Sequence, residues 1–208
     1  MSLLLYDNPS SSNALKARFM LTELGLDYER RTVPFDLPRA AWYLAVNPMG
    51  GIPTLDDEGT IVSESHAILR YLAAREARDD LYPADLAGRA AVDTFLDRWA
   101  LTFRPAFFRY EVPALGYVPG KGMFGEDPHP GELPAVAEAI APTLLLLDGL
   151  VDAAGWALGR FTIVDVAAAP VLFRTVETGL DLEPYENISR WRETVLARPS
   201  WVAADPIC

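Results

Sequence analysis

The sequence predicts an α/β unit followed by an all-α unit. Residues 1–76 alternate short apolar runs with helical patterns in the order β-α-β-α-β-β-α, whereas beyond residues 78–83 the apolar positions recur only at helical spacing. The chain has 208 residues, of which 50% are hydrophobic, and this is enough for a sizeable buried core. We therefore expect two domains, over residues 1–78 and 85–208.

The chain opens with an expected strand and helix. Residues 3–6 form a short apolar run that ends at turn-forming residues, which is typical of a buried strand. Apolar residues then recur at offsets of three and four over residues 12–24, and this spacing predicts a helix on which Lys16 and Arg18 face water. Gly25 follows where a left-handed residue commonly ends a helix.

A strand, a short helix and a hairpin complete the α/β unit. The second strand is expected over residues 28–33 and the short helix over residues 38–44. Residues 52–56 and 60–62 read as a hairpin, because a Gly-containing turn separates them. The Ser-Glu-Ser run at residues 63–65 offers N-cap side chains to the helix that follows.

The second half is expected to be helical throughout, without a strand beyond residue 83. Residues 113–134 contain five prolines and five glycines, which forbids a regular helix and predicts a long loop.

Composition excludes several classes of site and partner. The single cysteine, Cys208 at the last position, cannot form an internal disulfide, and with two histidines it cannot complete the usual Cys/His zinc sites. The net charge of −11 argues against nucleic acid or an anionic membrane as the main partner. Because no basic region precedes the first apolar run, we expect a cytoplasmic protein.

Two segments carry a family resemblance. Residues 47–55 read NPMGGIPTL, and residues 64–72 read ESHAILRYL. With the helical sequence that follows them, they resemble the cytosolic glutathione transferase family. Residues 161–167 (FTIVDVA) look like the family's buried capping box, whereas residues 104–134 are unmatched. The resemblance implies a thioredoxin-like N-terminal domain, an α-helical C-terminal domain and a homodimer, with glutathione as co-substrate and a small hydrophobic electrophile as second substrate.

The resemblance also implies which residues bind glutathione. The family's proline at the position of Pro53 is cis, and it turns the backbone of Ile52 outward to pair with the cysteinyl part of glutathione. Glu64 and Ser65 resemble the pair that binds the γ-glutamyl end, since a hydroxyl and an N–H at a helix start suit a carboxylate and Glu64 suits an ammonium group. The alternative is that Ser65 only caps the helix. Where the family commonly has Lys or Gln, this chain has Gly51.

Arg39 or another residue of the second helix is a candidate to replace the carboxylate contact that Gly51 cannot make.

The serine run at residues 10–12 determines the expected chemistry. Serine-type members of the family place the thiol-activating hydroxyl fourteen positions before the glycine that ends the first helix, and counting back from Gly25 gives Ser11. Ser10 and Ser12 remain alternatives, as does a role limited to helix capping. Tyr6 is another possible donor, but its place within the apolar strand favours a role in the core.

The second-substrate pocket is less well defined by the sequence. The candidate wall is an aromatic and basic cluster made of Trp99, Phe103, Arg104, Phe107, Phe108, Arg109 and Tyr110. A role in the helix core is at least as well supported for Trp99, Phe103 and Phe107, which recur every four residues. Arg104, Phe108 and Tyr117 remain as candidates for the wall alone.

The remaining polar candidates are assigned structural or surface roles. Thr162 and Asp165 are expected to form a capping box that serves folding. His66 and His129 are expected to be ordinary exposed histidines without a catalytic role.

The sequence thus favours glutathione conjugation of a small hydrophobic electrophile, with Ser11 stabilising the thiolate. Two alternatives stay open: a non-catalytic binding or regulatory protein of the same fold, and a glutathione-dependent isomerase or dehalogenase.

Overall fold

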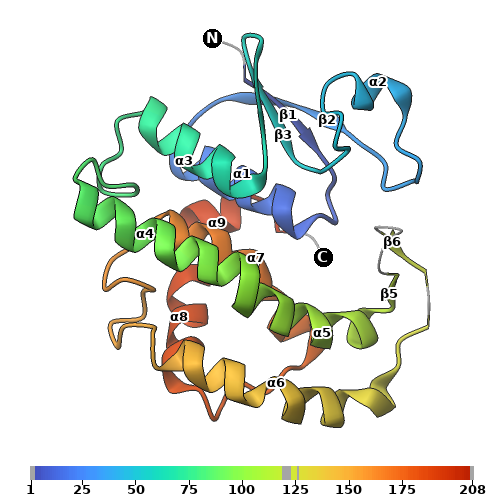
Figure 1. Cartoon of the computed structure of the whole chain (residues 1–208), viewed down its shortest axis with the longest axis vertical. Coiled ribbons are helices and arrows are strands. Elements are labelled where there is room, and N and C mark those ends of the chain that lie inside the picture. Colours follow the sequence, from blue (N-terminus) through green and yellow to red (C-terminus); the bar gives the residue numbers. More distant parts are fainter. Residues whose placement is uncertain (1–2, 119–122, 126, 207–208) are drawn as a thin grey trace.

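The computed structural model describes residues 3–118, 123–125 and 127–206, so that Cys208 lies outside the described residues. Figure 1 shows a sheet-containing half stacked on a larger helical half. The elements follow in the order β1 (Leu3–Asp7), α1 (Ser12–Glu23), β2 (Tyr28–Thr32), α2 (Ala41–Leu44), β3 (Thr54–Asp57), β4 (Thr60–Ser63), α3 (Ser65–Arg75), α4 (Leu86–Arg98), the π-helical turn η1 (Trp99–Phe103), α5 (Arg104–Leu115), β5 (Tyr117–Val118), β6 (Met123–Phe124), the 3₁₀ turn η2 (Pro130–Glu132), α6 (Leu133–Asp148), α7 (Ile163–Thr178), α8 (Glu186–Leu196) and α9 (Pro199–Ala203).

The N-terminal sheet has the strand order β2-β1-β3-β4. Strand β1 runs parallel to β2 and antiparallel to β3, so Leu5 lies opposite Leu55. The β3–β4 hairpin turns through Glu58 and Gly59, which both have positive φ, as a two-residue turn of this hand requires.

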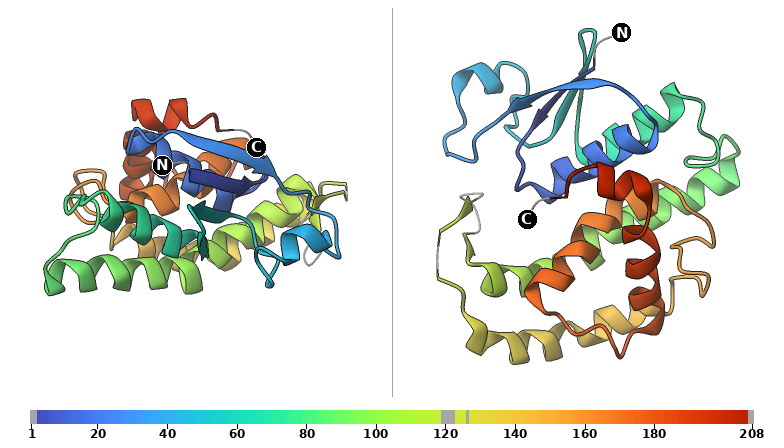
Figure 2. Two further views of the ribbon diagram at one scale, coloured as in Figure 1. Left: turned by 90° about the horizontal axis from the view of Figure 1, so that it is seen from above. Right: turned by 180° about the vertical axis from the view of Figure 1, so that it is seen from behind.

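The two faces of the sheet are covered by different helices. Helices α1 and α3 lie between the sheet and the helical half, and α2 lies beyond the sheet (Figures 1 and 2). Because side chains alternate along β1, Leu3 and Leu5 join the main core, whereas Tyr6 packs with Tyr43 of α2 on the opposite face. The expected core role of Tyr6 is confirmed.

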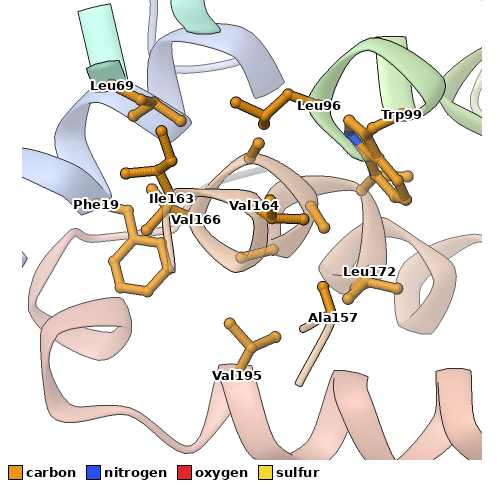
Figure 3. Packing of buried hydrophobic residues seen from close by; sticks show 14 of the residues in the cluster. Phe19, Leu69, Leu96, Trp99, Ala157, Ile163, Val164, Val166, Leu172 and Val195 are labelled. Atoms are coloured by element: carbon orange, nitrogen blue, oxygen red, sulfur yellow. The ribbon is translucent and has the colours of Figure 1, made fainter. Parts of the chain in front are cut away.

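Helix α7 is the centre of the main core. Its residues Ile163, Val164 and Val166 are fully buried. Figure 3 shows the side chains around it, which come from α1, α3, α4, η1 and α8: Phe19, Leu69, Leu96, Trp99 and Val195. The same hydrophobic cluster therefore joins the two halves of the chain.

The capping box at the start of α7 is present as expected. The Thr162 hydroxyl accepts from the Val164 N–H, and the Asp165 carboxylate accepts from the Thr162 N–H at 2.7 Å. Asp165 also accepts from the Ala157 N–H and from the Trp191 ring N–H, at 2.9 and 2.7 Å. It thus connects α7 to α8 and to the preceding loop.

Three details of the expected fold are wrong. Lys16 and Arg18 do not face water but are buried, because α1 packs against α3, α7 and α9. Strands β5 and β6 form a small hairpin in the half that was expected to contain helices alone. Helix α5 continues through Pro113 to Leu115, and Gly116 ends it with φ of 64°, so the segment 113–134 is not one continuous loop.

Helix α6 is the most apolar surface element among the described residues. With the turn before it, Pro130–Asp148 is long and apolar enough to cross a membrane by length and composition alone, which is weak evidence for a span. In this fold α6 packs on α5 and α8 and buries Ile140, Leu144 and Leu147.

Candidate functional site

A cavity of about 550 Å³ lies where the N-terminal half meets α5 and α7. This volume is in the range of small-molecule sites. Its walls come from the start of α1, the loop before α2, the start of α3, and η1, α5, β5 and α7; the lining residues are Ser10, Ser11, Ser12, Asn13, Lys16, Phe35, Arg39, Ile52, Glu64, Ser65, His66, Trp99, Ala100, Arg104, Pro105, Phe108, Tyr117 and Arg174.

Ser11 lies at the N-terminus of α1 on the wall of this cavity. It is the N-cap residue, and its side-chain oxygen accepts from the Ala14 N–H at 3.2 Å. The hydroxyl hydrogen is not used by this cap, because an oxygen that accepts from the helix can still donate its own hydrogen. Capping and donation to a ligand are therefore compatible at Ser11.

The two neighbouring serines are held from the helical half. Arg174 on α7 donates to the Ser10 carbonyl oxygen at 2.7 Å. Arg104 on α5 donates to the Ser12 hydroxyl at 3.5 Å. All three serines line the cavity, and the geometry alone does not single out one of them.

The residues of the 47–55 motif fix the backbone at Ile52. The Asn47 side chain donates to the Gly51 carbonyl at 3.0 Å and to the Thr54 hydroxyl at 3.1 Å. The Tyr43 hydroxyl also donates to the Gly51 carbonyl. The Ile52–Pro53 peptide bond is cis, as the family resemblance implied, and Ile52 lines the cavity.

The start of α3 is open on the cavity side. Its N-cap residue is Glu64, with φ of 68°, and no side chain in the described part of the chain caps the helix, so the expected capping by the Ser-Glu-Ser run is wrong. Because the first N–H groups of a helix are unpaired within it and carry partial positive charge, this end suits an anion. Glu64 and Ser65 both line the cavity beside it.

Lys16 is a site residue that sequence reasoning missed. Its side chain is 3% exposed, and its Nζ donates to the Ser65 hydroxyl at 3.5 Å and lies 3.2 Å from His66 Nε2. Burial, followed by the charge of Arg104, lowers the pKa of Lys16 to about 7, against the opposing effect of Glu111 and Glu64. Helical spacing placed Lys16 on the water-facing side, so no sequence signal pointed to it.

His66 is not the exposed histidine that the sequence suggested. It is half-buried on the cavity wall, and burial, Lys16 and Arg70 lower its pKa to about 3. The ring is therefore neutral at any ordinary pH. His129, in contrast, is exposed.

Comparison with known proteins agrees with this geometry. Models of the N-terminal and C-terminal domains of glutathione S-transferases match residues 10–75 and 130–194. Glutathione S-transferase GstB of Escherichia coli is 30% identical over 201 residues, covering 94% of either chain. The chain belongs to the glutathione S-transferase family.

Two further similarities support the family assignment. Glutathione S-transferase 3 of Zea mays is 31% identical over 219 residues, covering 99% of this transferase and 95% of the maize protein. A glutathione transferase family member from Pseudomonas fluorescens, solved with two glutathione bound, is 25% identical with a TM-score of 0.78, covering 99% of this chain and 93% of that one. The expected fold, a thioredoxin-like domain followed by a helical domain, is confirmed.

Arg39 of the transferase lies against the turn that carries Gly51. Its Nε donates to the Gly50 carbonyl at 3.1 Å, and its Nη1 donates to the carbonyls of Pro34 and Asp36. Gly50 has φ of 66°, and a Cβ there would lie 3.0 Å from Arg39 Cγ, so the glycine permits the close approach. Arg39 thus brings a positive charge to the cavity wall near the glycine that departs from the family pattern.

The opposite wall of the transferase's cavity contains the residues suggested for the second pocket. Arg104, Phe108 and Tyr117 all line it. The rings of Phe108 and Tyr117 meet edge to face with centroids 5.1 Å apart, and the Arg104 guanidinium carbon lies 4.7 Å from the Phe108 ring centre. Phe103 and Phe107 belong to the core as expected, whereas Trp99 belongs to the core and also touches the cavity.

Proposed function

We propose that this transferase binds glutathione in the cavity and activates its thiol at Ser11 for attack on a small electrophile. The observation that carries the proposal is that Ser11, of the three serines on the cavity wall, is the N-cap residue of α1. A thiolate beside it would accept a hydrogen bond from the Ser11 hydroxyl and would lie in the favourable field of the helix N-terminus.

The required change in the thiol pKa is modest. A free thiol has a pKa of about 8.5, and a hydrogen bond to a charged group contributes roughly 1.5–3 kcal/mol, which lowers the pKa by about one to two. A helix N-terminus adds about 0.3–1 kcal/mol for an anion. The thiolate would then be the main form near neutral pH.

The rest of glutathione would be bound by groups at the two ends of the cavity. The uncapped start of α3 with Ser65 and Lys16 suits the γ-glutamyl carboxylate, and Glu64 suits the ammonium group. The backbone at Ile52 suits the cysteinyl part, and Arg39 suits the glycyl carboxylate in place of the side chain that Gly51 lacks.

We propose that the two domains have the separate binding roles that the sequence suggested. Residues 1–78 would supply the glutathione contacts, and residues 85–208 would supply the wall of the electrophile pocket with Phe108 and Tyr117. We further expect a cytoplasmic homodimer, which light scattering of the purified protein and fractionation of cells would test.

Thiolate formation on binding tests the proposal directly. Glutathione added to the wild-type protein should produce the ultraviolet absorbance of a thiolate with an apparent pKa below that of free glutathione. The substitution Ser11→Ala should raise the pKa of the bound thiol by about one to two pH units, whereas Ser10→Ala and Ser12→Ala should change it little. Absence of glutathione binding, or a thiolate signal that survives in Ser11→Ala but not in a neighbour, would contradict the assignment.

A further inference from the structure

The cavity has the opposite charge to the protein around it. The chain carries a net charge of −11. The cavity is nevertheless lined by four basic side chains and one acidic side chain, namely Lys16, Arg39, Arg104, Arg174 and Glu64. Such a reversal within a low-dielectric cleft concentrates anions there.

Glutathione, bound as proposed above, does not use all of these positive charges. Its two carboxylates would lie at Lys16 with the start of α3, and at Arg39. Arg104 and Arg174 lie on α5 and α7, on the side of the aromatic wall. The inference that follows rests on this proposed binding mode.

Arg174 is committed to structural contacts. Its side chain is 7% exposed; it donates to the Ser10 carbonyl at 2.7 Å and to Glu111 Oε2 at 3.2 Å. Arg104 shares that Glu111 oxygen at 3.4 Å. Two guanidinium groups therefore share one buried carboxylate, and the three side chains keep a net positive charge.

Arg104 is the less neutralised of the two arginines. Its Nη2 makes the long contacts to Glu111 and Ser12. Its Nη1 is buried and has no hydrogen-bond partner among the residues that the structure describes. The guanidinium is held against the Phe108 ring. A cation in this environment attracts an anion more strongly than it would in water, because solvent screens it less.

We propose that the electrophile pocket selects substrates that carry a carboxylate or a similar anionic group near the reactive carbon, and that Arg104 determines this preference. The aromatic wall receives the body of the substrate, and Arg104 balances its charge. In the reaction the glutathione sulfur forms a bond to the electrophilic carbon, the leaving group departs with its electron pair, and the thiol proton passes to solvent. The anionic group takes no part in the bond changes.

A matched pair of electrophiles tests this inference. The probes are 4-chloro-3-nitrobenzoate and 4-chloro-3-nitrobenzamide, which both lose chloride to the thiolate and differ in charge. For each, kcat/KM is divided by the rate constant of the uncatalysed reaction with glutathione, so that intrinsic reactivity cancels. The wild-type protein should favour the benzoate in this normalised ratio.

The variants separate recognition of the charge from damage to the fold. Arg104→Gln should lower the ratio of kcat/KM for the benzoate to kcat/KM for the benzamide by about ten-fold or more. Effects of the substitution on glutathione through Ser12 or Lys16 are common to both electrophiles and cancel in this ratio. Arg104→Lys should keep part of the preference. Arg109→Gln is the matched control, because Arg109 lies on the same helix but is exposed and outside the cavity lining.

Product binding gives a second readout that needs no turnover. The S-conjugate with the carboxylate should bind the wild-type protein more tightly than the carboxamide conjugate, and Arg104→Gln should abolish the difference in calorimetry.

Three results would overturn the inference: an equal loss for both electrophiles in Arg104→Gln, a change confined to the KM for glutathione, or no wild-type preference in either assay. Where one of these three results occurs while glutathione binds and the benzamide is turned over, the proposed function holds and this inference fails alone. If glutathione does not bind, the proposed function fails first.

Discussion

Replacement of Lys16 by methionine is the sharpest test of the glutathione site. Lys16 is surrounded by Ser65 and His66 at the start of α3, by Glu64 before it, and by Arg104 and Glu111 of α5. The folded protein lowers its pKa from 10.5 to about 7. A difference of about 3.5 between these pKa values corresponds to roughly 5 kcal/mol of unfavourable free energy for the protonated form, because one pKa unit corresponds to about 1.36 kcal/mol.

The effect on stability has a definite sign. Below pH 7 Lys16 is protonated in the folded and the unfolded chain, and the whole penalty applies. Between pH 7 and 10.5 the folded protein releases the proton while the unfolded chain keeps it, so the wild-type protein gains stability as the pH rises. Lys16→Met should therefore be most stabilising at pH 6, and its advantage over the wild type should fall by roughly 2–3 kcal/mol by pH 9.

The same substitution should weaken ligand binding. S-methylglutathione is the probe, because it has both carboxylates but no thiol to titrate. Loss of a charge-assisted hydrogen bond of roughly 1.5–3 kcal/mol should raise its Kd by about 10- to 100-fold in Lys16→Met at pH 6.5. In the wild type the Kd should rise above pH 7 as Lys16 loses its proton, whereas Lys16→Arg should remove this pH dependence.

Calorimetric titrations and urea unfolding at pH 6 and pH 9 measure both effects. Two results would refute the role assigned to Lys16. One is that Lys16→Met binds S-methylglutathione as tightly as the wild type does. The other is that the unfolding free energy of the wild type does not rise relative to that of Lys16→Met between pH 6 and pH 9.

Three further predictions concern the supports of the site. Asp165→Ala leaves buried N–H donors of Ala157, Thr162 and Trp191 unpaired and should lower the unfolding free energy by about 3–6 kcal/mol, with kcat/KM of the folded fraction nearly unchanged; loss of activity without loss of stability would contradict a folding role. Asn47→Ala removes the donors to Gly51 and Thr54 and should cost about 2–4 kcal/mol in denaturant unfolding while raising the KM for glutathione. Gly50→Ala should cost about 1–2 kcal/mol in the same assay, because its φ is positive and its Cβ would press on Arg39; an unchanged midpoint would show that the turn relaxes.

The fold could be predicted from sequence where local signals agreed with the tertiary environment. The strand and helix order of residues 3–75, the capping box at Thr162 and the core position of Phe103 follow from periodicity and cap chemistry. The prediction failed for α1, because this helix is enclosed by its neighbours and has no water-facing stripe, so Lys16 and Arg18 are buried. Arg18 is an example: it is fully buried, donates to the Pro9 carbonyl and lies 3.9 Å from Asp7.

Proline and glycine content misled the prediction for residues 113–134. Pro113 lies in the last turn of α5, and Gly116 then supplies the left-handed residue that ends the helix. The short β5–β6 hairpin that follows brings Tyr117 to the cavity wall. Two-residue strands have too few positions for an alternating pattern, so no periodicity could reveal them.

The site itself was predictable only on its N-terminal side. Ser11, Ile52, Glu64 and Ser65 lie in motifs that can be recognised locally, and all four line the cavity. The charges that hold the serine run in place come from positions far along the chain, since Arg104 reaches Ser12 across 92 residues and Arg174 reaches Ser10 across 164.

No local pattern distinguishes such arginines from surface arginines on an amphipathic helix, because their partners are determined by the docking of the two halves. The serine loop is consequently fixed by both halves together: α1 supplies the cap at Ser11, and α5 and α7 supply the cations on either side of it. A sequence motif can therefore identify the hydroxyl, but the electrostatic field in which a thiol beside it would ionise depends also on the arginines of the docked helical half.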